Sequence, residues 1–168
     1  GVIWIDIDNF KVYNDIYGFE AGDNVLIAVA KLLHITLTEC IEQFFLGHIG
    51  GDDFLLVLGT QDWRKRLNQL LDDFHTQCRR FYRAEHLEAG CFVALNRQGV
   101  RQEFALLSLS IGVVHLHPQA CDQLDASQLA EMASQAKHHA KNVQGYSVHV
   151  IDSLAAPEKE NVLLAGHR

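Results

Sequence analysis

The stretch Ile49-Gly50-Gly51-Asp52-Asp53-Phe54 decides how this chain folds. Two adjacent glycines between apolar segments are typical of a tight turn between strands, and the apolar run over 54–58 predicts the second strand. Glycine there also lets another group approach the backbone closely. Two neighbouring carboxylates repel each other unless a cation lies nearby. The same residues also suit a solvated hairpin tip, so the turn alone leaves both interpretations open.

A second acidic segment lies upstream. The apolar run over residues 2–5 predicts a buried central strand, and Asp6 and Asp8 come at its C-terminal end. Ligands of open α/β sheets bind at that end of the strands. If the strand end and the turn converge, Asp6 and Asp52 can share one divalent cation, and carboxylate and carbonyl ligands suit Mg²⁺ or Mn²⁺. A hard cation held in this way usually acts on phosphates.

Composition narrows the class of protein. At 168 residues, with 48% hydrophobic and 21% charged residues, the chain is about one globular domain. The net charge of −7 gives no basic surface for nucleic acid. The four cysteines form no CxxC pair, which argues against a cysteine zinc site and favours a reducing compartment. No apolar run approaches the roughly 18 residues that span a bilayer. We therefore expect a cytoplasmic domain of a longer protein, and a membrane anchor elsewhere in that protein stays open.

Hydrophobic periodicity predicts alternating helices and strands in the rest of the chain. The helices expected are a short turn over 9–18, a long helix capped by Asp23 and ending near 42, and helices over about 61–82 and 127–141. The further strands expected are 44–46, 91–95, 104–114 and 146–151, with 96–99 joining two of them as a hairpin. No clear period follows Asp152.

Some polar and aromatic side chains fit two interpretations. Lys137 and Lys141 lie four residues apart on one helix face, where they suit a phosphate chain or simply a solvated helix end. Four histidines suit metal binding but lack a ligand spacing, so a surface position is the simpler interpretation: His115, His117, His138 and His139. Trp4 and Trp63 are expected to pack in the core or at its rim.

Several motifs, in order, resemble the GGDEF domain of the diguanylate cyclase family of bacterial signalling proteins. They are residues 6–18, Gly22-Asp23, 50–54, 108–113 and 135–137. The resemblance covers residues 1–151, which we take as the domain, with its N-terminal helix missing, and 152–168 as a tail or linker. It implies an α+β fold with a central, mostly antiparallel five-stranded sheet flanked by helices. This fold is nucleotide-cyclase-like, with a ferredoxin-like core and an extra β-hairpin.

The resemblance also implies a reaction and its site. Two GTP molecules condense to cyclic di-GMP and pyrophosphate, with Mg²⁺ or Mn²⁺, in a homodimer whose halves each hold one GTP. The implied metal ligands are Asp6, Asp52 and the carbonyl of Ile7, and the implied catalytic residues are Asp52 and Asp53. The implied guanine readers are Asn14 and Asp23. The residues implied near the phosphates are Phe10, Lys11, Gly50, Gly51, Lys137 and Lys141.

Departures from the family pattern leave two functions open. Asp53 stands where the family has glutamate, and a shift of about 1 Å at a catalytic group can cost on the order of 100-fold in rate. Residues 41–44 lack the family's Arg-x-x-Asp product-inhibition motif. The chain is expected to be an active diguanylate cyclase. The alternative is a catalytically impaired GTP-binding domain that regulates an attached EAL-type phosphodiesterase or another module. The long hairpin near 88–104 resembles that of EAL fusions.

Overall fold

The structure is a computed structural model that describes residues 1–38, 44–59, 62–96, 98–117, 124–143, 145–153 and 161–164. Its strands are β1 (Val2–Ile7), β2 (Phe44–Gly50), β3 (Asp53–Leu58), β4 (Cys91–Leu95), β5 (Arg101–Ala105), β6 (Leu109–His115), β7 (Ser147–Asp152) and β8 (Asn161–Leu164). Its helices are α1 (Phe10–Tyr17), α2 (Phe19–Thr38), α3 (Trp63–Cys78), the 3₁₀ turn η1 (Arg79–Phe81), α4 (Ala84–Ala89) and α6 (Ala126–Lys141).

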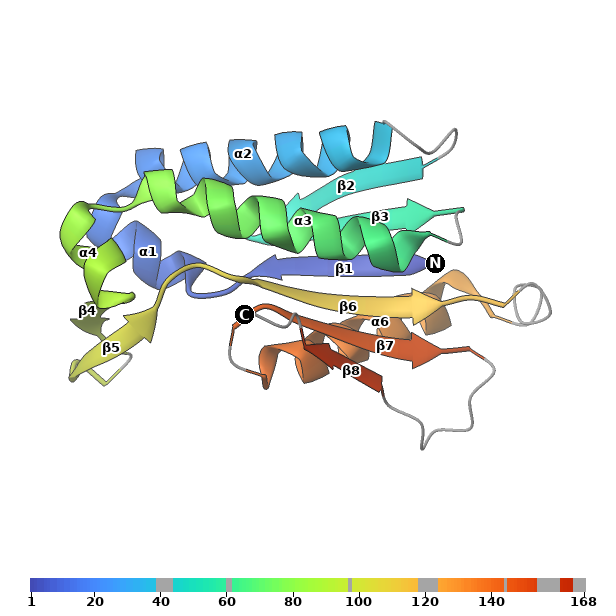
Figure 1. Cartoon of the computed structure of the whole chain (residues 1–168). Coiled ribbons are helices and arrows are strands. Elements are labelled where there is room, and N and C mark those ends of the chain that lie inside the picture. The colour runs from blue at the N-terminus through green and yellow to red at the C-terminus, as the bar shows by residue number, and fades with distance from the viewer. Residues whose placement is uncertain are drawn as a thin grey trace.

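One sheet organises the molecule, with the strand order β2-β3-β1-β6-β7-β8 (Figure 1). Only the β6–β7 pair is parallel; the other described pairs are antiparallel. The predicted α+β class with a mostly antiparallel sheet is therefore confirmed, and β4 and β5 form the predicted extra hairpin. The strand β8 extends the sheet within the segment 152–168, where we expected only a tail or linker.

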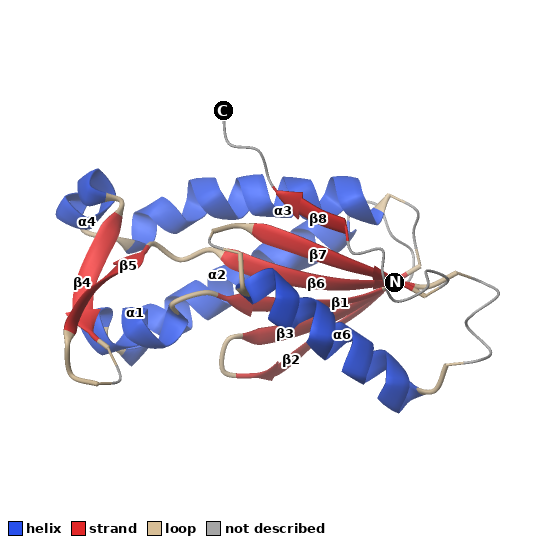
Figure 2. Cartoon of the chain, turned by 90° about the horizontal axis from the view of Figure 1, so that it is seen from below, coloured by secondary structure: helices blue, strands red, loops and turns tan. Residues whose placement is uncertain are grey.

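Helices cover both faces of the sheet. α2 and α3 lie on one face and α6 on the other (Figures 1 and 2). Successive side chains of a strand point to opposite faces. Accordingly, Ile3, Ile5 and Ile7 belong to the main core under α2 and α3, while Val2 and Trp4 belong to a smaller cluster under α6. Asp6 therefore faces α6, and this sets the composition of the site.

Three predicted boundaries were wrong. Asp23 does not cap the long helix, because α2 already begins at Phe19. The helix expected to reach residue 82 ends at Cys78, and η1 and α4 follow it. The strand expected over 104–114 is split into β5 and β6. Between them the backbone N–H of Leu107 donates to the Tyr82 hydroxyl (2.7 Å), so the main chain leaves the ladder to pair with a side chain.

The other predicted elements appear with shifted ends. α1, α6, β2, β3, β4 and β7 each overlap the residues expected for them. Cys78 and Cys91 are free thiols, and Cys40, Cys121 and positions 41–43 lie outside the described residues. None of the described helices is both long and apolar enough to cross a bilayer. At the end of the sheet where β1 finishes, α1, α4 and the β4–β5 hairpin gather (Figure 1).

Candidate functional site

The two acidic segments converge at the end of β1, as predicted. Asp6 pairs with Asp53 across the β1–β3 ladder, and the amide of Ile7 donates to the carbonyl of Asp52 (3.3 Å). Carboxylate oxygens of Asp6, Asp52 and Asp53 all lie within 4.8 Å of one another. The glycines at the tip of the hairpin are exposed, as the solvated-tip interpretation expects, whereas Asp52 and Asp53 are half-buried beside the end of β1.

The turn owes its shape to its glycines. Gly50 and Gly51 have φ values of +141° and +59°, which residues with a side chain rarely adopt. His48 lies beside them, and its Nε2 is 3.0 Å from the carbonyl oxygen of Gly51. This conformation reverses the chain between β2 and β3 and leaves Asp52 and Asp53 next to β1.

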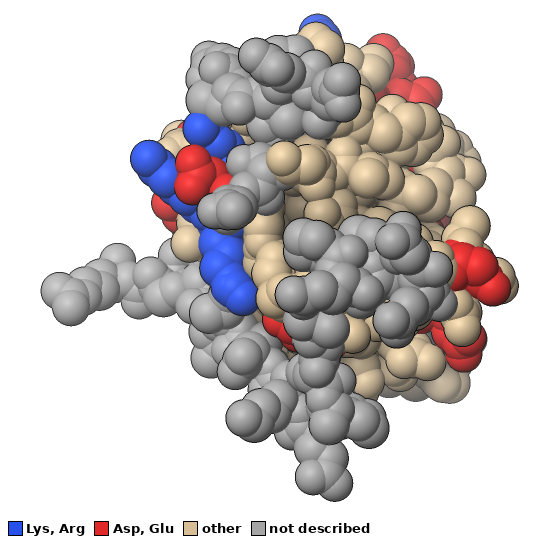
Figure 3. All heavy atoms as spheres, turned by 90° about the vertical axis from the view of Figure 1, so that its right-hand side faces the viewer, with Lys and Arg blue, Asp and Glu red and all other residues tan. Residues whose placement is uncertain are grey.

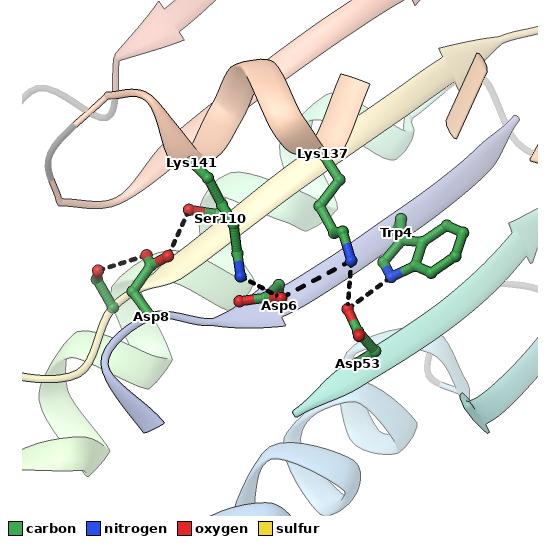
Figure 4. A network of polar contacts seen from close by, with 8 residues as sticks. Trp4, Asp6, Asp8, Asp53, Ser110, Lys137 and Lys141 are labelled. Carbon is green, nitrogen blue, oxygen red and sulfur yellow. Dashed lines mark hydrogen bonds and ion pairs between the residues drawn. The ribbon is translucent and has the colours of Figure 1, made fainter. Parts of the chain in front are cut away.

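Two lysines of α6, which covers this face of the sheet, point towards the carboxylates (Figure 4). The Nζ of Lys141 lies 2.6 Å from Asp6 Oδ2. The Nζ of Lys137 lies 2.8 Å from Asp53 Oδ1 and 3.8 Å from Asp6 Oδ2. Each amine is thus paired with an acid of the sheet, although the Lys141 side chain remains 41% exposed at the end of the helix and that of Lys137 is 18% exposed.

Gly112 is what lets α6 lie this close to the sheet. A Cβ at this position of β6 would come within 2.2 Å of the backbone nitrogen of Lys137 and 2.7 Å of the carbonyl carbon of Ala136. Real Cβ contacts essentially never fall below 3.0 Å. The close approach of strand and helix therefore requires glycine and places the two lysines above the acids.

Burial controls the electrostatics of the cluster. Asp6 is only 2% exposed, and this burial raises the pKa of its carboxyl to about 7, although the hydrogen bond from Lys141 opposes the rise. For Asp53 burial acts in the same direction, but the hydrogen bonds from Lys137 and Trp4 outweigh it and lower the pKa. The pKa values of the two neighbouring acids are thus shifted in opposite directions, and Asp53 is held as the anion.

The donor set fits a hard divalent cation. Asp6 Oδ1 is buried and has no hydrogen-bond partner among the described residues, so it keeps a lone pair available. Three clustered carboxylates without a nitrogen or sulfur ligand are the oxygen-only chemistry that Mg²⁺ and Mn²⁺ prefer. The role of the Ile7 carbonyl as a further ligand stays a prediction.

The two predicted guanine readers lie on α1 and α2. Asn14 Oδ1 is buried and lacks a hydrogen-bond partner among the described residues, whereas Asp23 is exposed. Gly22 packs against Asn14: a Cβ on it would lie 1.8 Å from that same oxygen. An unpaired buried acceptor is costly unless something donates to it, and none of the described residues donates to this oxygen.

A hollow of about 810 Å³ opens beside the carboxylates, towards the β4–β5 hairpin. Its lining includes Asp8, Phe10, Lys11, Asp52, Ser108 and Lys141. Five of the predicted site residues line this one cavity: Ile7, Phe10, Lys11, Asp52 and Lys141. The other predicted site residues are not among its lining residues: Asp6, Asn14, Asp23, Gly50, Gly51, Asp53 and Lys137.

Sequence reasoning missed two residues of this site. The indole N–H of Trp4 donates to Asp53 Oδ1 (2.8 Å), and Lys137 Nζ lies 4.5 Å from the Trp4 ring centroid. Asp8 accepts hydrogen bonds from the hydroxyls of Ser108 and Ser110, each at 2.7 Å. The spacing of Trp4 two residues before Asp6 was the available signal, because alternate strand residues share a face. Both tryptophans pack as expected, Trp63 in the core and Trp4, partly buried, against the smaller cluster under α6.

Comparison with known proteins shows the family to which this sequence is similar. The family described as "Diguanylate cyclase, GGDEF domain" matches residues 1–145. Diguanylate cyclase DgcP of Escherichia coli (strain K12) is 32% identical over 139 residues, which make up 82% of this chain and 35% of that protein. The chain spans about a third or less of the length of the first curated relatives it matches.

Solved structures share the fold. The active GGEEF domain of a diguanylate cyclase from Vibrio cholerae is 25% identical, with a TM-score of 0.57, covering 84% of this chain and 75% of that one. The GGDEF domain of DgcB from Caulobacter crescentus, in complex with c-di-GMP, has a TM-score of 0.61 at 17% identity, covering 92% and 77% of the two chains. The second likeness concerns the fold alone.

Proposed function

Since the chain belongs to the GGDEF domain family of diguanylate cyclases, we propose that it binds GTP with Mg²⁺ or Mn²⁺ and joins two GTP molecules into cyclic di-GMP. The observation that carries this proposal is the convergence of three carboxylates and two lysines at the end of β1. Each 3′-hydroxyl attacks the α-phosphorus of the other nucleotide, and two pyrophosphates leave. One domain holds one GTP, so turnover requires two copies of it.

In this proposal Asp6, Asp52 and the carbonyl of Ile7 hold the metal. A divalent cation there neutralises charge on the phosphate oxygens. The unpartnered Asp6 Oδ1 and the oxygen-only cluster support the assignment. Because the pKa of Asp6 is raised to about 7, metal binding competes with a proton on this carboxyl.

In this proposal the two lysines pair first with the acids and then with the triphosphate. Without metal, Lys137 and Lys141 neutralise Asp53 and Asp6. Once a cation takes over that task, their amines are available for the triphosphate, together with the exposed Lys11 on the rim of the hollow. Gly50 and Gly51 have no side chain, and the side chain of Phe10 at the start of α1 belongs to the main core, so main-chain groups can approach the nucleotide at all three positions.

Guanine recognition falls to Asn14 and Asp23. An amide and a carboxylate suit the edge of guanine, which offers N–H donors and the acceptors O6 and N3. The buried, unpartnered Oδ1 of Asn14 supports this role, since a guanine N–H group would satisfy it. Gly22 keeps room for the Asn14 side chain.

A second function rests on Asp53. Its carboxylate is one methylene shorter than the family's glutamate, and Trp4 and Lys137 both hydrogen-bond to it. A carboxylate held back in this way suits a domain that binds GTP without turnover and regulates an attached module, such as an EAL-type phosphodiesterase. The two functions share the binding site and differ only in the chemical step.

The test is GTP turnover at high protein concentration with Mg²⁺ or Mn²⁺ and with the product identified. The variants are Asp53→Glu and Asp52→Ala, and Asp72→Ala on the exposed face of α3 is the matched control. Cyclic di-GMP from the wild type and the control, but not from Asp52→Ala, supports the cyclase. Metal-dependent GTP binding without product, with turnover gained only in Asp53→Glu, supports the regulatory domain. GTP binding that survives in Asp52→Ala without any metal dependence refutes both.

A further inference from the structure

A second polar cluster lies at the opposite end of the sheet from the carboxylates. β6 runs antiparallel to β1, so that Ile7 pairs with Leu109 near the acids while Val2 pairs with Val114 at the far end. There the structure brings together His115, His117 and Asp152. Both histidines lie partly at the surface, with about one-third of each side chain exposed, and both face the carboxylate of Asp152.

We propose that His115, His117 and Asp152 form a binding site for a divalent transition metal, with Zn²⁺ the best fit. One imidazole nitrogen of each histidine and one oxygen of the aspartate lie within 4.8 Å of one another. His117 Nε2 lies 2.9 Å from Asp152 Oδ1, and His115 Nδ1 lies 3.4 Å from Asp152 Oδ2. The two imidazole rings are 4.7 Å apart between centroids.

Strand alternation explains why the three side chains meet. On β6, Ile111 and Val113 point into the main core, and His115 continues the same row. On β7, Val148 and Val150 belong to that core, and Asp152 continues their row. β6 and β7 are parallel, and His115 pairs with Asp152 in the register. The apolar row of β6 thus ends in His115 and that of β7 in Asp152, and both side chains lie on the α3 side of the sheet.

The backbone holds this arrangement beyond the strand ends. The amide of Ser153 donates to the carbonyl of His115 (3.0 Å), and the amide of His117 donates to the Ser153 hydroxyl (3.0 Å). The ring of Trp63 at the start of α3 packs 5.8 Å from the ring of His115. A ligand set fixed in this way loses little freedom when it binds a metal, which favours affinity.

The donor chemistry selects the metal. Two imidazoles and one carboxylate are a common protein ligand set for Zn²⁺, whereas Mg²⁺ prefers oxygen ligands alone. Zinc bonds of about 2.0–2.1 Å in a tetrahedron place ligand atoms about 3.3 Å apart. Measured to one oxygen, Asp152 Oδ2, the two distances are 3.1 Å from His117 Nε2 and 3.4 Å from His115 Nδ1, both already close to that edge. The three protein ligands leave a fourth position for water or another donor.

Figure 3 faces this end of the molecule, and the Lys and Arg side chains that it shows lie mainly along one side. One described cation, Arg64, lies over the ring of Trp63, with its guanidinium carbon 4.5 Å from the ring centroid. A metal here would tie the ends of β6 and β7 together and stabilise the folded state by mass action.

The test is Zn²⁺ binding by the metal-free protein, measured by competition with a chromophoric chelator in excess Mg²⁺, which occupies the oxygen-only cluster. We expect one tight Zn²⁺ per chain, at least tenfold weaker in His117→Gln and in Asp152→Asn. His138→Gln, an exposed histidine on α6, is the matched control and should bind as the wild type does. Circular dichroism verifies that each variant is folded.

Co²⁺ gives a second measurement, since its visible absorption reports nitrogen ligands directly. We expect an intense band in the wild type and in the control that His117→Gln loses. Equal Zn²⁺ affinity in the wild type, His117→Gln and Asp152→Asn overturns the proposal. Zn²⁺ binding that Asp52→Asn abolishes and His117→Gln keeps also overturns it, because the metal then lies at the carboxylate cluster.

Discussion

Replacing Gly112 with alanine tests the close packing of α6 on the sheet. The new Cβ would lie 2.2 Å from the backbone nitrogen of Lys137, and ordinary contact begins at 3.4 Å. The helix must therefore move away from β6 by about 0.8 Å to reach the 3.0 Å limit of real Cβ contacts, and by about 1.2 Å to reach ordinary contact. The obstructing atoms belong to the main chain, so rotation of a side chain cannot relieve the clash.

Two consequences follow from this displacement. Overpacking of this kind costs about 1–3 kcal/mol, which lowers the urea midpoint by roughly 1 M for a typical slope. The displacement also carries both lysines away from their acids, and the 2.6 Å contact between Lys141 and Asp6 is lost. A shift of about 1 Å in groups that hold a substrate can reduce turnover on the order of 100-fold.

Gly59→Ala is the matched control, because a Cβ there meets nothing within 4 Å. Alanine at an unstrained position restricts the unfolded chain, so we expect this variant to be as stable as the wild type or up to about 1 kcal/mol more stable. Urea unfolding followed by circular dichroism compares the three proteins. A Gly112→Ala variant within about 0.5 kcal/mol of the wild type would refute the packing argument.

Three further changes test single contacts of the site. Trp4→Phe removes the N–H donor to Asp53 and should lower the free energy of unfolding by about 1–2 kcal/mol in urea titrations. Burial raises the pKa of Asp6 from 3.8 to about 7, so the native state keeps a proton that the unfolded state loses. Relative to Asp6→Asn, the metal-free wild type should lose stability as pH rises between these values, by at most about 1.4 kcal/mol per pH unit in parallel urea titrations. Gly22→Ala displaces Asn14 and should weaken GTP binding about tenfold or more, with no further loss in an Asn14→Ala background, as a fluorescent GTP analogue would report.

The meeting of Asp6 and Asp52 could be predicted because the sequence pattern around each acid fixes its place in the fold. A strand end and a glycine turn each place acids at a defined point, and Asp6 and Asp52 needed only one pairing, β1 with β3, to meet. The two lysines four residues apart on α6 were also visible in the sequence. Their pairing with the acids was not, because it depends on the missing side chain of Gly112 on another strand.

Two other contacts between distant segments were not predictable. The break between β5 and β6 depends on the hydroxyl of Tyr82, which lies 25 residues before Leu107. The cluster of His115 with Asp152 joins residues 37 positions apart through the parallel register of β6 and β7. In both cases periodicity correctly marked the apolar rows, but it carried no information about which polar group would lie at the end of each row.

Charge balance couples the metal to the nucleotide in the proposed site. Above the pKa of Asp6, about 7, three carboxylates and two lysines leave one negative charge, which repels a triphosphate. A divalent cation reverses that sign and releases the lysine amines from Asp6 and Asp53. A bound metal makes the site attractive to the triphosphate, and a bound triphosphate makes it attractive to the metal. GTP and metal should therefore strengthen each other's binding by the same factor. The ion pairs of the metal-free site thus have a function of their own: they keep buried acids compensated until substrate and metal arrive together.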